Sequence, residues 1–233
     1  MVNSISKTVQ NLIDEDLSLK DALQRDYGNY SAIARMLLPK VKEAVNSEDV
    51  NLESVITSVK RAKANYTILQ GKITRVVAGS GLNIRTDMAK VSVDRTKKNL
   101  EQIRKTLATF SGEFLQVIEG NSVVTLISDL YSFSKISSIF DKTDVVDQKQ
   151  NLATVIIRSP DEITSTPGCV QAFYNAVSRR HINIEETMSC YTETIIVLAM
   201  ENVSKAFAAL TDLIKKARTK TVIKCGQKTE KVT

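Results

Sequence analysis

Hydrophobic residues in the first 66 positions recur three and four residues apart, which is the spacing of amphipathic helices. Val9 and Ile13 fall on one face of the first predicted helix, and Val55 and Val59 fall on one face of the fourth. Helices this short need one another to bury their apolar stripes. Residues 1–66 are therefore expected to form a small helical bundle.

The spacing changes in residues 67–86, where three glycines interrupt the pattern: Gly71, Gly79 and Gly81. The run TILQGKITRVV alternates in part between apolar and polar residues, which predicts a strand or a hairpin with a glycine turn. The run AGSGLN that follows is typical of a flexible boundary. We expect a glycine-containing linker with some strand between the bundle and the rest of the chain.

From residue 87 onward, strands and helices alternate in a fixed order. The run DMAKVSVD predicts a strand, RTKKNLEQIRKTLATF an amphipathic helix, GEFLQVIEGNSVVTLISD a hairpin, LYSFSKISSIFD a short helix and DVVDQ a weak closing strand. The order β-α-β-β-α-β fills residues 87–149.

The same order returns in residues 150–226. It runs through a strand at 151–159, a helix at 167–180, a strand pair at 182–200, a helix at 202–217 and a closing strand at 220–225. Residues 227–233 are expected to be a flexible tail.

Each repeat follows the ferredoxin-like pattern, a four-stranded antiparallel sheet backed by two helices on one face. The predicted fold class is α+β: a small N-terminal helical bundle followed by two ferredoxin-like βαββαβ units. One face of each sheet is left without a helix. Another module or a partner is expected to cover it, which favours a homodimer.

The net charge of +6 is uneven along the chain. Residues 1–110 hold 18 Lys and Arg against 12 Asp and Glu, whereas residues 111–233 hold 14 of each kind. Within the first half, residues 51–105 hold 12 basic residues against 4 acidic ones, a local +8. Such a segment is typical of a surface that meets an anionic partner.

The basic segment lies next to a helical module that resembles a helix-turn-helix variant. In this interpretation SLKDALQRDYGNYSAIARML supplies a helix, a turn and a helix, and VNLESVITSVKRAK is the recognition helix. The candidate nucleic-acid-binding residues are Lys60, Arg61, Lys63, Lys72 and Arg75. A solvated basic face is the alternative, and DNA affinity that falls steeply with salt would distinguish the two.

Several function classes find no support in the sequence. No apolar run reaches the roughly 18–20 residues of a membrane span, and the N-terminus does not resemble a signal peptide. The three cysteines are far apart and His181 is the only histidine, so no metal site is expected. No P-loop, GxGxxG, HExxH or GxSxG motif is present. We expect a cytoplasmic protein that is not an enzyme, without catalytic residues, metal or cofactor.

The run TPG at residues 166–168 leads from the first strand of the second repeat into its first helix. Pro167 is expected at the first helical position, where its missing N–H costs little. Gly168 lets a ligand come close to the helix end, and the unpaired first-turn N–H groups with the helix dipole suit a carboxylate. A tight turn with water on these N–H groups is the alternative.

The longer run TPGCVQAFYNAVSRRHINIEETMSCYTETIIVLAMENVSKAFAAL resembles the ACT domain, a small amino-acid-sensing regulatory module. The likeness rests on the PG turn, the apolar positions of the helix that follows, the INI segment and VSKAFAAL in the second helix. It spans about residues 151–226. Residues 87–149 look like a degenerate first copy, with Arg-Thr-Lys at 95–97 where Pro-Gly would stand.

The resemblance implies a free amino acid held at an interface between ACT units, by the strand-to-helix loop and the start of the second strand. The residues that would hold it are Thr166, Pro167, Gly168, Cys169, Val170, Asn183 and Ile184. The amide of Asn183 can both donate and accept, which suits an α-amino acid. Gly168→Val is expected to block the ligand and to leave the fold largely intact.

A helical module followed by ACT units also resembles archaeal regulators of amino-acid metabolism. The resemblance implies an amino-acid-responsive transcriptional regulator, and a homodimer because ACT sheets usually pair side by side. Two alternatives stay open. The chain could be a detached regulatory subunit that docks on a biosynthetic enzyme, or a structural protein with vestigial ACT units.

Overall fold

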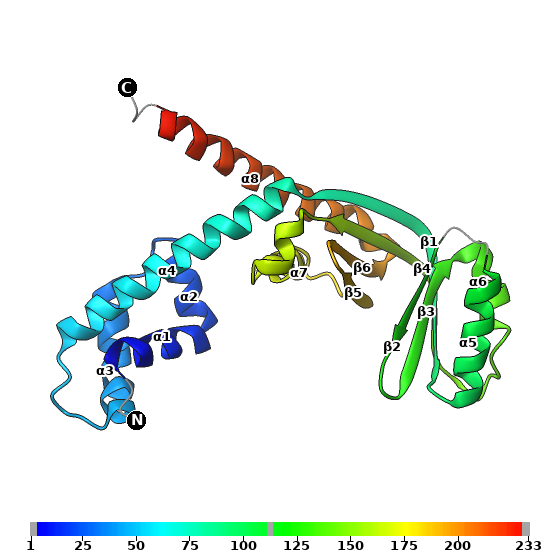
Figure 1. Ribbon diagram of the computed structural model, residues 1–233, viewed down its shortest axis with the longest axis horizontal. Coiled ribbons are helices and arrows are strands. Elements are labelled where there is room, and N and C mark those ends of the chain that lie inside the picture. The colour runs from blue at the N-terminus through cyan, green and yellow to red at the C-terminus, as the bar shows by residue number, and fades with distance from the viewer. Residues whose placement is uncertain (1–3, 111–113, 230–233) are drawn as a thin grey trace. The chain divides into compact units, whose positions relative to one another are not determined.

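The structure is a computed structural model that describes residues 4–110 and 114–229. The chain divides into two compact units, residues 1–73 and 74–233. In the described part of the chain, the first unit contains helices alone, and the second combines helices with one six-stranded sheet (Figure 1). The chain is thus a mixed helix-and-sheet protein.

Four helices build the first unit: α1 (Ile5–Glu15), α2 (Leu17–Gln24), α3 (Tyr30–Val45) and α4 (Leu52–Gly79), the last of which continues into the second unit. Their apolar stripes meet in one core, in which Val9, Ile13 and Val55 are fully buried. Asn51 Oδ1 accepts a hydrogen bond from the backbone N–H of Ser54 at 2.8 Å and so caps α4. The sequence predicted helices in these segments, but it placed the end of the fourth helix near residue 66, whereas α4 ends at Gly79.

A polar contact ties α1 to α4 at the edge of this core. Tyr66 Oη donates to Asp14 Oδ1 at 2.9 Å, and Gln10 Nε2 donates to Tyr66 Oη at 2.6 Å. Burial, together with the neighbouring Asp14 carboxylate, raises the pKa of the Tyr66 hydroxyl far above its usual value. Tyr66 therefore remains a hydrogen-bond donor at any physiological pH.

Residues 67–79 continue α4, so the prediction of a strand or hairpin there is wrong. Ile73, Val76 and Val77 are buried at the three- and four-residue spacing of a helix face. Gly71 lies inside the helix, where a glycine costs only about 1 kcal/mol relative to alanine. Packing of the apolar face outweighs this cost, which the partial alternation of the sequence does not reveal.

The end of α4 is held by residues that are distant in the sequence. Arg218 of the C-terminal helix donates from Nε to the carbonyl of Ala78 at 2.9 Å and from Nη2 to that of Ser80 at 3.1 Å. These bonds satisfy carbonyl groups that the helix itself leaves unpaired. A Cβ on Gly79 would come within 2.6 Å of the Pro160 ring, so glycine permits the close approach.

Arg218→Met should lower the free energy of unfolding of the second unit by about 1 kcal/mol, because two carbonyl groups lose a charged donor. Chemical unfolding followed by circular dichroism measures this loss. Lys216→Met changes an exposed neighbour on the same helix and should alter stability by less than about 0.5 kcal/mol. Equal losses in the two variants would contradict a capping role for Arg218.

Six antiparallel strands form the sheet in the order β2-β3-β1-β4-β6-β5. They are β1 (Gly81–Asp94), β2 (Leu115–Glu119), β3 (Val123–Asp129), β4 (Val145–Arg158), β5 (Glu186–Cys190) and β6 (Glu193–Ala199). The two central strands, β1 and β4, pair along most of their length. The sequence predicted separate strands at DVVDQ and at 151–159, but both segments belong to β4.

Each half of the sheet has its own pair of helices. In the first half, β2-β3-β1-β4, the helices are α5 (Lys97–Thr109) and α6 (Leu130–Ser137), and their core contains Val91, Leu126 and Phe133. In the second half, β1-β4-β6-β5, they are α7 (Cys169–Ser178) and α8 (Val203–Thr229), which pack on each other. The first half therefore uses the C-terminal part of β1, and the second half uses its N-terminal part.

The closing strand predicted at 220–225 is wrong, because these residues lie within α8. Its expected place beside β4 is taken by Gly81–Arg85, which pairs with Thr154–Arg158. The second half is thus completed by a strand that precedes the first half in the sequence. Of the tail predicted at 227–233, residues 227–229 are helical and the rest lies outside the described residues.

Both central strands bend where the two halves join. Asp87 and Asn151 have φ values of 54° and 58°, in the left-handed region, and the register of the strand pair shifts between Arg85 and Met88. Such irregularities bend a strand and increase its twist.

The bend brings together sheet faces that the helices leave uncovered. Met88 and Ile127 of the first half pack in one buried cluster with Leu152 and Val197 of the second half. Side chains alternate along a strand, so these residues lie on the faces opposite to the helix-facing cores. The sequence analysis expected another module or a partner to cover the helix-free face of each sheet. In part, the two halves of the same chain cover these faces for each other.

Candidate functional site

Gly168 forms the turn into α7. Its φ of 91° and ψ of −4° lie in a region that glycine adopts far more readily than other residues. The helix begins at Cys169 with Gly168 as its N-cap, so Pro167 precedes the helix and does not occupy its first position as predicted. No side chain within the described residues caps this end of α7, which leaves the first-turn N–H groups to solvent or a ligand.

The predicted loop residues differ in their accessibility. Pro167 and Gly168 are exposed and Val170 is half-buried, whereas Thr166 and Cys169 are buried. Burial raises the pKa of the Cys169 thiol, so the side chain stays protonated and fills space as a small apolar group. A ligand at this turn would therefore meet backbone groups and not the thiol.

Asn183 and Ile184 lie at the other end of α7 from Gly168. The helix has ten residues, Cys169–Ser178, so the two ends are about 15 Å apart. The INI segment does not open the second strand as predicted, because β5 begins at Glu186. Within one chain, the structure does not bring the two groups of predicted ligand residues together.

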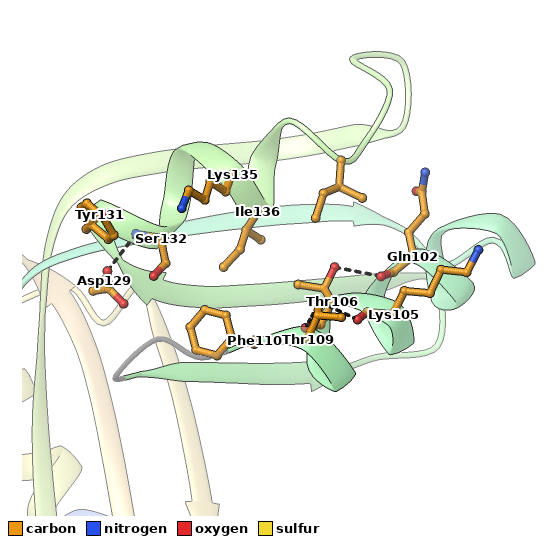
Figure 2. A pocket seen from close by; sticks show the side chains of 11 residues that line it. Gln102, Lys105, Thr106, Thr109, Phe110, Asp129, Tyr131, Ser132, Lys135 and Ile136 are labelled. Carbon is orange, nitrogen blue, oxygen red and sulfur yellow. Dashed lines mark hydrogen bonds between the residues drawn. The ribbon is translucent and has the colours of Figure 1, made fainter.

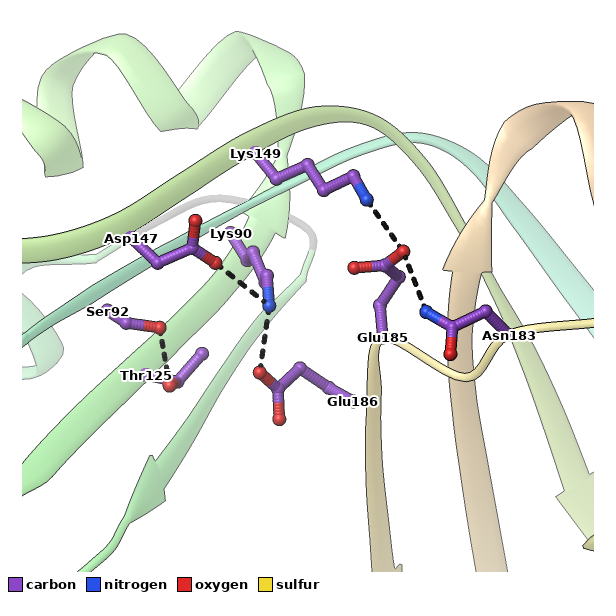
Figure 3. Close-up of polar contacts among 8 residues, drawn as sticks. All are labelled: Lys90, Ser92, Thr125, Asp147, Lys149, Asn183, Glu185 and Glu186. Carbon is purple, nitrogen blue, oxygen red and sulfur yellow. Dashed lines mark hydrogen bonds and ion pairs between the residues drawn. The ribbon is translucent and has the colours of Figure 1, made fainter.

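Asn183 instead belongs to a polar cluster on the inner side of the bent sheet (Figure 3). Its Nδ2 donates to Glu185 Oε1 at 3.3 Å, and Lys149 Nζ donates to the same oxygen at 2.6 Å. The Lys149 ammonium holds the pKa of the Glu185 carboxyl below its usual value, despite partial burial. The amide that the sequence analysis assigned to a ligand already has a partner.

Lys90 lies at the centre of the same cluster (Figure 3). Its Nζ is 3.0 Å from Glu186 Oε1 and 3.1 Å from Asp147 Oδ2, and its side chain is only 8% exposed. Burial alone lowers the pKa of Lys90, but the two carboxylates raise it more, so the ammonium stays charged. This lysine of the first half is thus bound to a glutamate of the second half.

The sequence analysis missed Lys90, which it counted only as part of the basic segment. A signal was present in the strand run DMAKVSVD, where alternation puts Lys90 on the same face as Met88 and Ser92. When a strand face is buried in the fold, a lysine on that face requires a partner of opposite charge. The partner itself could not be read from the sequence.

The stability contributed by Glu185 should depend on pH. Because its pKa is lower in the folded chain than the ordinary 4.5, the contribution is complete above that value and is lost as pH falls through the folded pKa. Melting temperatures of the wild type and Glu185→Gln, compared between about pH 3 and 7, should converge at the acidic end. A difference that does not change with pH would contradict this assignment.

The five candidate nucleic-acid-binding residues all lie on α4. Lys60, Arg61, Lys72 and Arg75 are exposed. Lys63 is engaged within the first unit, where its ammonium pairs with Asp26 and lies over the Tyr30 ring at 5.6 Å from the centroid. Hydrogen bonding to Asp26, together with Tyr30, raises the pKa of Lys63.

The local +8 of residues 51–105 is partly neutralised by the fold. Four of its cations form ion pairs with acids outside that segment: Lys63 with Asp26, Lys90 with Asp147 and Glu186, Arg95 with Glu119, and Lys98 with Asp141 and Asp144. The count along the sequence therefore overstates the positive charge that a partner would meet.

Other chemistry is sparse in the part of the chain that the structure describes. Its His, Cys, Asp and Glu side chains form no group of three that could hold a metal ion. No helix among these residues is long and apolar enough to span a membrane. His181 is exposed beyond the end of α7, and Cys169 and Cys190 are free thiols.

Comparison with known proteins gives similarity in structure alone. No protein-family model matches the chain, and a search of curated proteins finds no match. Aspartate kinase from Synechocystis has a TM-score of 0.50 and 17% identity, over 61% of this chain and 27% of that one.

Two further structures have lower scores. Aspartate kinase from Clostridium acetobutylicum gives a TM-score of 0.49 and 16% identity, and the match spans 58% of this chain and only 34% of that one. The ligand-free regulatory subunit of aspartate kinase from Thermus thermophilus gives a TM-score of 0.48 and 15% identity, and the match spans 57% of this chain and 97% of that one. The match to the Synechocystis enzyme alone shows that 61% of this chain shares its mixed helix-and-sheet fold with a part of that protein.

Proposed function

We propose that the chain is a regulatory, amino-acid-binding protein of the ACT type that acts as a separate subunit on an enzyme of amino-acid biosynthesis. One observation carries the proposal. Both halves of the sheet, β2-β3-β1-β4 and β1-β4-β6-β5, have the antiparallel strand order of a ferredoxin-like βαββαβ unit, with two helices each. The two units interlock because each uses parts of β1 and β4.

The turn at Gly168 supports a ligand site in the second unit. No side chain among the described residues caps the first-turn N–H groups of α7, and such groups suit a carboxylate. Asn183 follows the opposite end of this helix, which is about 15 Å long. An amino acid that contacts both groups needs the Gly168 turn of one copy and the Asn183 segment of another, which is the basis for proposing a homodimer.

The similarity in fold to a part of the Synechocystis aspartate kinase supports the proposed class of partner. This chain covers only 27% of the Synechocystis enzyme, so the similarity concerns a portion of that protein. We propose that the present chain supplies such a portion as an independent, non-catalytic protein. The ligand would favour one arrangement of subunits over another, and it can shift that equilibrium only by its differential affinity for the two.

A thermal-shift screen with the twenty amino acids tests the proposal. A ligand at about 100 times its dissociation constant should stabilise the folded chain by about 2.7 kcal/mol. Sedimentation velocity with and without the active amino acid then tests for a ligand-dependent dimer. If none of the twenty amino acids changes the melting temperature, the ligand site is rejected and the chain is better described as a structural protein with vestigial ACT units.

A pull-down from a native lysate tests the enzyme partner separately. Stoichiometric recovery of one biosynthetic enzyme, altered by the active amino acid, supports the subunit role. Recovery of no enzyme by a chain that does bind an amino acid would contradict the subunit role but not the ligand site.

DNA binding remains a second candidate because Lys60 and Arg61 are adjacent and exposed on α4. If phosphate contacts provide the affinity, duplex DNA should bind more weakly at about 200 mM salt than at about 50 mM salt. Fluorescence anisotropy measures this, with Lys60→Gln/Arg61→Gln as the test variant. Lys216→Gln/Lys220→Gln on α8 is the charge-matched control. Equal binding by the two double variants would exclude a specific role for α4.

A further inference from the structure

A pocket of about 880 Å³ lies between α5 and α6, in the first half of the sheet (Figure 2). Pockets that bind small molecules measure about 300–1,000 Å³. The pocket is formed by the half without a Pro-Gly turn, which the sequence analysis described as a degenerate first copy. It shares no residue with the Gly168 turn or the Asn183 segment.

Apolar side chains line the pocket on both the α5 side and the α6 side. Phe110 follows the end of α5, Ile136 projects from α6, and Ile139 lies just beyond that helix. The Tyr131 ring, 83% exposed, is a further aromatic surface on the same helix. These side chains suit a flat or branched apolar group, such as an aromatic ring.

Two buried oxygen atoms of the lining residues have no hydrogen-bond partner among the described residues. They are Gln102 Oε1 and Asp129 Oδ2. The other carboxylate oxygen of Asp129 accepts from the backbone N–H of Ser132 at 2.8 Å and caps α6, which fixes the position of the carboxylate. Buried acceptors are normally paired, and a ligand in the pocket that brings donors would pair these two atoms.

The two acceptors lie at opposite ends of the pocket, with the apolar side chains between them (Figure 2). A carboxylate at one end favours a cationic donor such as an ammonium group. A neutral amide oxygen at the other end requires only an N–H or O–H. Two exposed lysines, Lys105 of α5 and Lys135 of α6, line the same pocket and can neutralise a carboxylate at its mouth.

We propose that the α5–α6 pocket binds a free aromatic α-amino acid whose ring carries a polar hydrogen. The ammonium group pairs with Asp129, the carboxylate faces Lys135, and the ring lies against Phe110 and Ile136 with its donor toward Gln102. This site is additional to the interface site proposed above. Its location on the helix side of the first half means that one chain is sufficient to form it.

Four probes of similar shape test the chemistry by calorimetric titration of the full chain. L-tryptophan has every required group, tryptamine lacks the carboxylate, indole-3-propionate lacks the ammonium, and 1-methyl-L-tryptophan lacks the ring N–H. We expect tryptophan to bind most tightly and indole-3-propionate to be at least about tenfold weaker, because the charge-assisted bond to Asp129 is lost. Equal affinity for tryptophan and indole-3-propionate would overturn the proposal.

Asp129→Asn is the central variant because asparagine caps a helix as well as aspartate does. The fold should persist while tryptophan affinity falls by at least about tenfold. Asp141→Asn removes one carboxylate that does not line the pocket and is the charge-matched control. In Gln102→Leu, the preference for tryptophan over 1-methyl-L-tryptophan should disappear. Unchanged affinity in Asp129→Asn would refute the site.

Amide shifts in heteronuclear NMR spectra separate this site from the interface site. Tryptophan should shift the amides of Ser132 and Thr106, and the Asp129→Asn variant should lose those shifts. Shifts confined to Cys169 and Val170 would overturn the pocket assignment and support the interface site. Thermal shifts by another amino acid, with no effect of tryptophan at Ser132, would likewise reject the pocket alone.

Discussion

Removing both carboxylates around Lys90, in the variant Asp147→Asn/Glu186→Gln, should destabilise the second unit by about 3–5 kcal/mol. The Lys90 side chain is 8% exposed, and its ammonium is 3.0 Å and 3.1 Å from these two groups. The amide oxygens of the variant can still accept hydrogen bonds from the ammonium, but no counter-charge remains beside the buried cation, and an uncompensated buried charge is costly. Urea unfolding followed by circular dichroism measures the loss.

A third substitution distinguishes an unpaired charge from a general loss of packing. Adding Lys90→Met to the double variant removes the buried cation and keeps a side chain of similar length. Most of the lost stability should return, because the charge without a counter-charge is gone and the two amides lie on side chains that are partly exposed in the wild type. If the triple variant is as unstable as the double variant, the charge is not the cause.

Arg158→Met provides a matched control in the same sheet. Arg158 is also paired with a glutamate, Glu193, but the two side chains are 77% and 35% exposed. Exposed ion pairs contribute about 0–1 kcal/mol, so this variant should lose little stability. A loss as large as that of Asp147→Asn/Glu186→Gln would show that the burial of Lys90 does not explain the larger effect.

Gly168→Val should destabilise the second unit by about 1–3 kcal/mol. The expectation from sequence, that valine leaves the fold largely intact, is replaced because Gly168 has a φ of 91°. A β-branched residue is strongly disfavoured in that region. Loss of ligand binding in this variant would therefore not prove that the side chain blocks a ligand.

Gly168→Asn is the more informative change. Asparagine tolerates positive φ better than most residues, so the folding loss should be smaller than in Gly168→Val. Its side chain still occupies the approach to the α7 N–H groups, so the amino-acid thermal shift should disappear. Gly81→Ala is the control, because a Cβ there meets no atom within 4 Å. Equal stability of the valine and asparagine variants would contradict the backbone argument.

The candidate ligand residues show which features of a site can be predicted from local sequence patterns. The TPG turn and the helix after it were predictable, because proline, glycine and the helical spacing act over a few residues. The separation of Gly168 from Asn183 also follows from the helix between them, but the sequence analysis grouped them through the family resemblance. The unpartnered oxygens of Gln102 and Asp129 had no sequence signal, because their surroundings come from two helices.

By itself, the sequence determined α1, α2, α3 and the first part of α4, the hairpins of the second unit, and α5 and α7, because the spacing of hydrophobic residues indicates which face of a single element is buried. Tertiary structure alone decided that Gly81–Arg85 completes the second half while 220–225 remain helical. It also decided that Lys90 meets Glu186. The physical reason is that strand pairing and ion pairing between distant segments depend on which surfaces meet in the folded chain. The local sequence of a segment does not specify which distant segment it will meet.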